Sequence, residues 1–142
     1  IANTVKNLGY TPRVALLSFS NFGNPIRPSS KNIREAVNIL IEREVDFEFD
    51  GEMTAEVALD HNLIEENYPF CRLSGSANVL IMPGLLSANI SFKLLQSLGG
   101  GSVLGPLMIG GEKPFQIVQM GSSVSDIVNS ASIAAYNAIY SK

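Results

Sequence analysis

The spacing of apolar residues changes several times along this chain. Short continuous apolar runs that end at Gly, Pro or Asn are typical of strands covered on both faces. Such runs predict strands at residues 14–19, 77–82, 103–109 and 115–118. Residues 45–49 instead alternate apolar and acidic side chains, which predicts a half-exposed strand nearer an edge of the sheet.

Between these runs, apolar residues recur at helical spacing. A first helix is expected from Ser29 or Ser30, either of which can act as its N-cap, and shorter helices at residues 53–59 and 87–98. A last helix is expected from Ser123 onward. The predicted inward-facing residues are Ile33, Val37, Leu40, Ile41, Ala55, Ala58, Leu59, Ile90, Leu94, Leu95, Leu98, Ile127, Ala131, Ala134, Ala135 and Ala138.

The alternation of strands and helices predicts one α/β domain with a mostly parallel sheet and helices on both faces. Ligands in such sheets lie at the carboxyl ends of the strands. The residues that follow the predicted strands are therefore candidates for a binding rim: Ser18, Ser20, Asp50, residues 83–89 and residues 119–126.

The composition narrows the class of protein. A chain of 142 residues that is 46% hydrophobic and 16% charged can form one globular core, and its formal charge of −3 is mild. Lys and Arg do not cluster with aromatic residues, so a nucleic-acid partner is not expected. Short apolar runs, a start without a secretory pattern and one cysteine predict a cytoplasmic, non-membrane protein. The absence of an initial Met suggests a fragment.

Two reactive residue types occur once each. Cys71 has no neighbouring base in the sequence, so a nucleophilic role is not expected. His61 lies in a stretch that resembles a turn, and without a second His or Cys nearby it has no metal-site spacing. The sequence therefore predicts neither a cysteine nucleophile nor a metal centre.

Two other motifs have both structural and chemical interpretations. Asp50 and Glu52 have no basic partner in the sequence, and the simplest interpretation is a turn that ends the preceding strand and places negative charge at a helix start. The alternative is that the two carboxylates form an acid/base pair or bind Mg²⁺. Residues 99–101, three glycines, fit a left-handed helix cap better than a phosphate loop, because they follow a helix and lack the Gly-Lys-Ser/Thr ending.

Near the end of the chain, Ser123 and Asp126 form a capping-box pattern before an apolar helical segment. The pattern explains Asp126 structurally, while the free N–H groups of the same helix start could also hold an anion. Lys113, which precedes Pro114 in a tight connection, is interpreted as a solvated side chain, with a nucleotide-phosphate contact as the alternative.

Several stretches in a fixed order resemble the phosphate acetyl/butyryltransferase family over essentially the whole chain: residues 16–20, 50–53, 76–83, 87–94, 105–106, 113–114 and 126–127. The resemblance covers the latter part of that domain, roughly its final half. It implies a phosphotransacetylase-like fold of the isocitrate/isopropylmalate dehydrogenase type.

The family's reactive stretch reads Ser-Arg-Gly, four variable residues, then Asp-Ile, and its arginine holds phosphate. Here Gln119 stands at the serine position and Met120 at the arginine position, while Gly121 and Asp126 remain. A thioether cannot replace a planar, charged guanidinium. Ser97 also stands where many members carry an arginine for CoA, and Gly84 and Leu86 replace polar residues. These departures predict binding without turnover.

Within the family, residues 18–23, 50–53 with 57–59, and 68–75 look like the C-terminal domain fused to bacterial NADP-dependent malic enzymes. This implies a parent enzyme that converts malate to pyruvate and CO₂ with NADP and Mg²⁺ or Mn²⁺. Its malic-enzyme and NAD(P)-binding domains would be N-terminal and absent from this chain. The present domain is then expected to bind no cofactor itself, to assemble a homo-oligomer, a dimer or larger, and to respond to acetyl-CoA.

By carry-over from the family, the acetyl-CoA effector site would be lined by Ser18, Ser20, Asn89, Lys113, Gly121 and Asp126. An active acyltransferase that moves an acyl group between CoA and phosphate is the alternative function. A purely structural oligomerisation module is a third.

Overall fold

The computed structural model describes residues 1–99 and 101–140. The chain divides into two compact units. The first unit consists of Ile1, Asn3–Tyr10 and Leu94–Lys142, and the second of Ala2 and Thr11–Lys93. Each unit is described below by itself.

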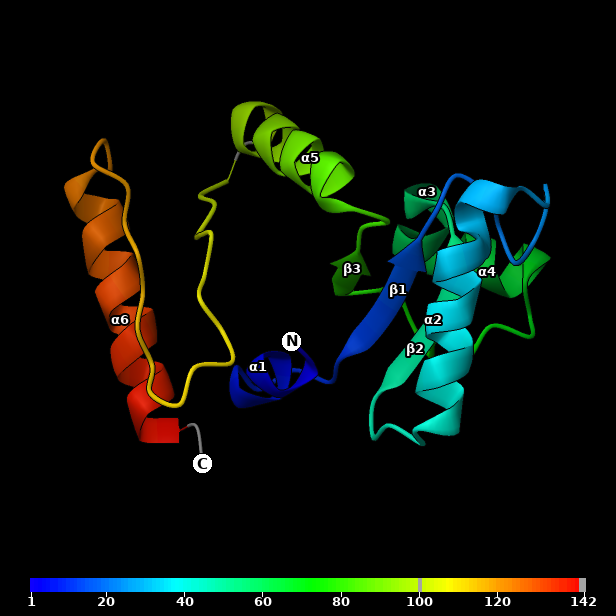
Figure 1. Cartoon of the computed structure of the whole chain (residues 1–142), viewed down its shortest axis with the longest axis horizontal. Helices are drawn as coiled ribbons and strands as arrows, with labels where there is room; N and C mark the ends of the chain where they lie inside the picture. Colours follow the sequence, from blue (N-terminus) through cyan, green and yellow to red (C-terminus); the bar gives the residue numbers. More distant parts are fainter. Residues whose placement is uncertain (100, 141–142) are drawn as a thin grey trace. The chain divides into compact units, whose positions relative to one another are not determined.

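The second unit is built on a parallel sheet. Its strands are β1 (Arg13–Leu17), β2 (Glu48–Met53) and β3 (Val79–Ile81), in the order β2-β1-β3, and both neighbouring pairs are parallel. The helices of this unit are η1 (Pro28–Ser30), α2 (Lys31–Glu42), α3 (Ala55–Leu59), α4 (His61–Asn67) and the larger part of α5 (Leu85–Leu98), up to Lys93. Figure 1 shows α2 in front of the sheet and α3 and α4 behind it. The predicted parallel α/β architecture is confirmed.

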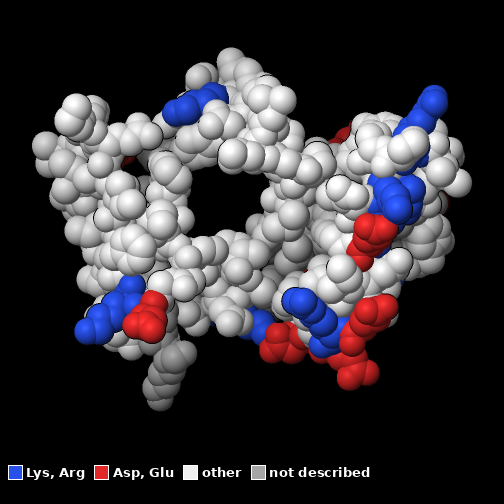
Figure 2. All heavy atoms as spheres, in the orientation of Figure 1, with Lys and Arg blue, Asp and Glu red and all other residues white. Residues whose placement is uncertain are grey.

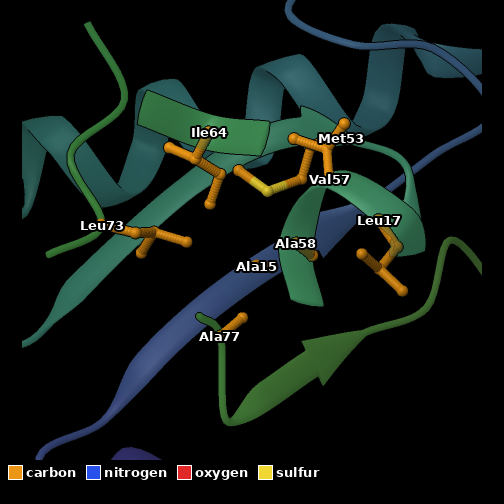
Figure 3. Packing of buried hydrophobic residues seen from close by; sticks show 8 residues of the cluster. All are labelled: Ala15, Leu17, Met53, Val57, Ala58, Ile64, Leu73 and Ala77. Carbon is orange, nitrogen blue, oxygen red and sulfur yellow. The ribbon is translucent and has the colours of Figure 1, made fainter. Parts of the chain in front are cut away.

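The core of this unit explains why β1 is apolar throughout. Ala15 and Leu17 of β1 pack with residues of β2, α3, α4 and the following loops in one cluster, drawn in Figure 3: Ala15, Leu17, Met53, Val57, Ala58, Ile64, Leu73 and Ala77. Because side chains alternate along a strand, Val14 and Leu16 point to the opposite face, and both are buried. A central strand covered on both faces needs apolar residues at every position.

The strands differ from the sequence-based expectation at their ends. β2 begins at Glu48 and continues through Asp50, Gly51 and Glu52. The predicted turn at Asp50–Glu52 is therefore wrong, since pairing with β1 extends to Met53 across an irregularity in the register. β2 lies at an edge of the described sheet as predicted, but β3 lies at the other edge, so only β1 is more central. β3 is shorter than expected, and only Val79 in it is fully buried.

The helices of the second unit lie close to their predicted positions. In α2, Ile33 and Val37 are buried as expected, whereas Ile41 is exposed. In α3 the buried residues are Val57 and Ala58, so the inward orientation expected for Ala55 and Leu59 is wrong. These two residues lie on the solvent side of a helix that is only five residues long.

The starts of α2 and α4 differ from the sequence-based expectation. The hydroxyl of Ser30, the residue before α2, donates to the carbonyl oxygen of Arg27 at 3.1 Å instead of capping the helix. His61 is not in a turn but begins α4, because the Asp60 carboxylate accepts hydrogen bonds from the amides of Asn62 and Leu63 and so starts a new helix.

The first unit contains α1 (Ala2–Asn7) except its first residue, the end of α5 (Leu85–Leu98), and α6 (Val124–Tyr140). The Tyr136 hydroxyl on α6 donates to the carbonyl oxygen of Asn7 at 2.6 Å. The strands predicted at residues 103–109 and 115–118 are wrong, because the described residues form no backbone ladder there. The Gln116 side chain instead accepts from the amide of Met108 and donates to its carbonyl oxygen, at 2.9 and 3.2 Å.

Helices α5 and α6 form where the sequence predicts them, but the side chains expected to face inward are exposed, or half-buried in the case of Ala134. Neither has a buried residue among those described. On α5, Ile90, Leu94, Leu95 and Leu98 are 53–80% exposed. Gly99 continues the helical bonding by donating to Leu95 and does not adopt the predicted left-handed conformation, nor does Gly101; Gly100 lies outside the described residues.

Among the described helices, none combines the length and apolar character that a bilayer crossing requires. On the face seen in Figure 2, Lys and Arg side chains lie next to Asp and Glu side chains, without a large patch of one sign.

Candidate functional site

The carboxyl end of β1 lies beside the end of β2 and brings two predicted site residues together. The Ser18 and Ser20 hydroxyl oxygens are 3.4 Å apart. Ser18 is half-buried, and its amide donates to the carbonyl oxygen of Met53 at 2.8 Å. Ser20 is buried, and its hydroxyl donates to Oε1 of Glu52 at 2.6 Å. Ser20 therefore contributes to this site through Glu52.

Glu52 is a fully buried carboxylate, and both of its oxygens have a hydrogen-bond donor. Nη1 of Arg34, on α2, lies 3.2 and 3.1 Å from its two oxygens. The same Nη1 donates to the Ser30 hydroxyl at 2.7 Å. Because a buried charge is costly unless it is paired and hydrogen-bonded, Arg34 makes the burial of Glu52 possible.

Asp50 is buried in a similar way. Its oxygens accept from the amides of Gly51 at 2.9 Å and Arg72 at 2.8 Å. Nε of Arg72 lies 4.0 Å from the same carboxylate, and the Arg72 guanidinium lies over the Phe49 ring. Asp50 thus joins the edge strand to the loop after α4.

The sequence-based statement that Asp50 and Glu52 have no basic partner is wrong. Arg34 and Arg72 lie 18 and 22 residues away from the carboxylates that they contact, so no local pattern reveals the pairing. The sequence contains one hint that Arg34 faces the sheet: it follows Ile33 and so lies at the border of the buried stripe of α2. Among the described residues, no group of His, Cys, Asp and Glu gathers as a metal site would require.

The loop before α6 contains the second group of predicted site residues. The Asp126 carboxylate accepts from the amide and the hydroxyl of Ser123, at 2.9 and 2.8 Å, and the Asp126 amide donates to the Ser123 hydroxyl at 3.2 Å. The predicted capping box is confirmed. Hydrogen bonds from Ser123 lower the pKa of Asp126, because they stabilise its charged form.

Next to this cap, Gln119, Met120 and Gly121 are exposed. The Met120 side chain is fully exposed, and a Cβ added at Gly121 would meet open space. The amide of Ser122 donates to the carbonyl oxygen of Gln119 at 3.0 Å and closes the turn. Lys113 is also exposed, and lines a cavity of about 130 Å³ within the same unit.

The six predicted effector-site residues are divided between the two units. Ser18, Ser20 and Asn89 belong to the second unit, and Asn89 is exposed on α5. Lys113, Gly121 and Asp126 belong to the first. The structure brings Ser18 and Ser20 together; a single site formed by all six residues stays a prediction.

Cys71 lies near the Asp50 carboxylate. Burial raises the pKa of its thiol, and the negative charge of Asp50 raises it further. A thiol with a raised pKa is protonated at neutral pH and is a poor nucleophile, which agrees with the sequence-based expectation.

Comparison with known proteins identifies relatives over nearly the whole chain. The family model for phosphate acetyl/butaryl transferases matches residues 1–135. An NADP-dependent malic enzyme of Rhizobium meliloti is 58% identical over 96% of this chain, and a phosphate acetyltransferase of Treponema pallidum is 42% identical over 89% of it. The solved EutD phosphotransacetylase from Staphylococcus aureus superimposes with a TM-score of 0.87 and 32% identity over 96% of the chain.

The chain spans only part of each of these relatives. It covers 18% of the malic enzyme, 38% of the phosphate acetyltransferase and 43% of the solved phosphotransacetylase chain. In the malic enzymes, the matched stretch is the C-terminal portion. The family model matches nearly the whole of this chain, and the fold is shared with a solved phosphotransacetylase. This chain therefore belongs to the phosphate acetyl/butyryl transferase family.

Proposed function

We propose that this chain is a non-catalytic regulatory and oligomerisation domain of an NADP-dependent malic enzyme, and that it senses acetyl-CoA. The observation that carries the proposal is Met120. A neutral, fully exposed side chain occupies the position where the family's reactive stretch has a phosphate-binding arginine. The preceding residue, Gln119, replaces the family's serine.

The loss of this arginine has a large expected effect on chemistry. Phosphoryl and acyl transfer depend on donors and positive charge aimed at the charge that develops in the transition state. Removing one such group lowers turnover by about 10²–10³-fold in well-studied enzymes. The capping role of Asp126 does not need turnover, so the loop can keep its shape without the reaction.

The activity of the proposed parent enzyme is the oxidative decarboxylation of malate to pyruvate and CO₂, with NADP and Mg²⁺ or Mn²⁺. The 58% identity to a malic enzyme supports this parent. The residues for that chemistry would lie outside this chain, which covers 18% of that relative. Oligomer assembly and an acetyl-CoA response are the roles proposed for the present domain, in a cytoplasmic enzyme.

An active acyl-CoA:phosphate acyltransferase is the alternative. The 42% identity to a phosphate acetyltransferase and the retained Asp126 favour it. The two functions differ in one measurable reaction, the release of CoA from acetyl-CoA in the presence of phosphate.

The test uses the full-length protein that contains this chain. Incubated with acetyl-CoA and inorganic phosphate, it should release no CoA above the buffer rate, as followed with a thiol reagent. The variant Gln119→Ser/Met120→Arg should gain phosphate affinity, whereas the matched neutral variant Gln119→Ser/Met120→Gln should not. Turnover by the unaltered protein would overturn the proposal.

The sensing role is tested separately. Acetyl-CoA should raise the melting temperature of the full-length protein and change its malate-dependent NADP reduction. If millimolar acetyl-CoA changes neither quantity, a purely structural oligomerisation module is the better interpretation.

A further inference from the structure

A cavity of about 320 Å³ opens beside the edge strand β2, within the second unit. Its walls come from α2, from β2, from the loop after β1 and from the loop after α4. The residues that matter for its chemistry are Phe22, Arg34, Asn38, Phe70 and Arg72. The volume is at the lower end of the range of small-molecule sites.

The two carboxylates that line this cavity, Asp50 and Glu52, are engaged with protein donors. Glu52 is fully buried, and its oxygens accept from Ser20 and Arg34. Asp50 accepts from two backbone amides. Their negative charges are balanced by the two arginines, so the groups that remain available to a ligand are the guanidinium donors.

Both guanidinium groups have donors to spare. Every hydrogen bond of the Arg34 side chain within the described part of the chain uses Nη1, which leaves Nη2 and Nε for another acceptor. The Arg72 guanidinium approaches Asp50 only through Nε, and its face lies over the Phe49 ring. The two side chains are 33% and 46% exposed. Planar forks with free N–H groups match the oxygens of carboxylates and phosphates.

Two aromatic side chains, Phe22 and Phe70, also line the cavity. The rings of Phe22 and Phe70 lie edge to face with centroids 5.0 Å apart, and Phe70 is 65% exposed. Asn38, exposed on α2, adds a neutral amide to the lining. Aromatic rings together with a few polar donors are the usual lining of small-molecule sites.

We propose that this cavity binds a small anion with an apolar body, its carboxylate or phosphate oxygens on Arg34 and Arg72 and its body against Phe22 and Phe70. The binding is expected to be modest, since the two arginines already balance two carboxylates. The proposal does not depend on acetyl-CoA or on the loop at Met120.

The test measures anion affinity of the full-length protein by titration calorimetry without acetyl-CoA. The probes are phenyl phosphate, benzoate and inorganic phosphate. Phenyl phosphate and benzoate carry the same ring, so their relative affinities distinguish a phosphate from a carboxylate ligand. Inorganic phosphate lacks the ring and should bind more weakly than phenyl phosphate.

Two variants on α2 form a matched pair, one inside the cavity as the test and one outside it as the control. Asn38→Asp places a negative charge at the cavity without breaking any ion pair and should weaken phenyl phosphate binding about tenfold or more. Asn32→Asp adds the same charge to an exposed position of α2 outside the cavity lining and should leave binding unchanged. Phe70→Leu should weaken phenyl phosphate but not inorganic phosphate.

Equal weakening by both aspartate variants would show a general charge effect and overturn the proposal. Failure of both phenyl phosphate and benzoate to bind at about 10 mM would also overturn it. Because acetyl-CoA is absent from these titrations, their outcome is independent of the acetyl-CoA assays.

Discussion

At the scale of single residues, the most informative feature is the burial of two carboxylates near the end of β2. Asp50 and Glu52 are 4% and 0% exposed, and each meets an arginine from a distant segment. Burying a charge without a partner costs several kcal/mol, so the arginines are required for the fold as well as available for a ligand.

Arg34→Met should therefore destabilise the protein. The substitution leaves the buried Glu52 carboxylate without its cation. Breaking a fully buried ion pair lowers the free energy of unfolding by about 3–5 kcal/mol. We expect a loss of about 2–3 kcal/mol here, because Arg34 is one-third exposed. Chemical denaturation measures the loss. The double variant Arg34→Met/Glu52→Gln removes the orphaned charge and should recover part of the stability; a double variant as unstable as the single one would contradict the pairing.

Asp126 provides a second prediction at this scale. Because Ser123 lowers the pKa of Asp126, an NMR titration should place it below the ordinary range for aspartate, and Ser123→Ala should return it toward that range. A lowered folded-state pKa means that the cap stabilises the protein above the unfolded pKa and that this contribution is lost as the pH falls through the folded pKa. An unchanged pKa in Ser123→Ala would contradict the capping geometry.

At the scale of elements, the contrast between β1 and residues 103–109 is instructive. Both segments are apolar runs, but β1 has a parallel neighbour on each side, whereas the described part of the first unit offers residues 103–109 no backbone ladder. A single side chain, Gln116, takes over both hydrogen bonds of Met108. An apolar run thus becomes a strand only where another strand pairs with it.

The close approach of β1 and β2 leads to a prediction for Gly51. A Cβ at this position would lie 2.6 Å from the carbonyl oxygen of Leu16, a backbone atom that cannot move aside. Gly51→Ala should destabilise the protein by about 1–3 kcal/mol, as overpacking does. Gly84→Ala is the matched control, because its Cβ would meet nothing within 4 Å. Equal melting temperatures for the two variants would argue against this register.

At the scale of the whole molecule, burial is concentrated in the second unit. Its sheet and short helices enclose the hydrophobic cluster of Figure 3. In contrast, α5 and α6 have no buried residue among those described. Isolated helices of this length are marginal in water, since most helical stability in proteins comes from packing of the apolar face.

Hydrogen exchange of the 142-residue chain should show this difference. The amides of β1 and β2 should exchange slowest, those of α5 and α6 much faster. Helix α2 is the internal control, because it is similar in length to α5 but buries Ile33 and Val37. Protection of α5 equal to that of α2, measured by mass spectrometry, would mean that its apolar face is covered in solution.

The sequence by itself determined the parallel α/β class, the approximate positions of α2, α5 and α6, the Ser123–Asp126 cap and the family. These depend on periods and caps that act within a few residues. Only the tertiary structure decided that Asp50 and Glu52 lie inside a strand, that Arg34 and Arg72 balance them, and that residues 103–118 do not pair as strands. Each of those outcomes depends on which distant segment supplies the partner, and side-chain and backbone pairing across 18 or more residues leaves no periodic trace in the chain.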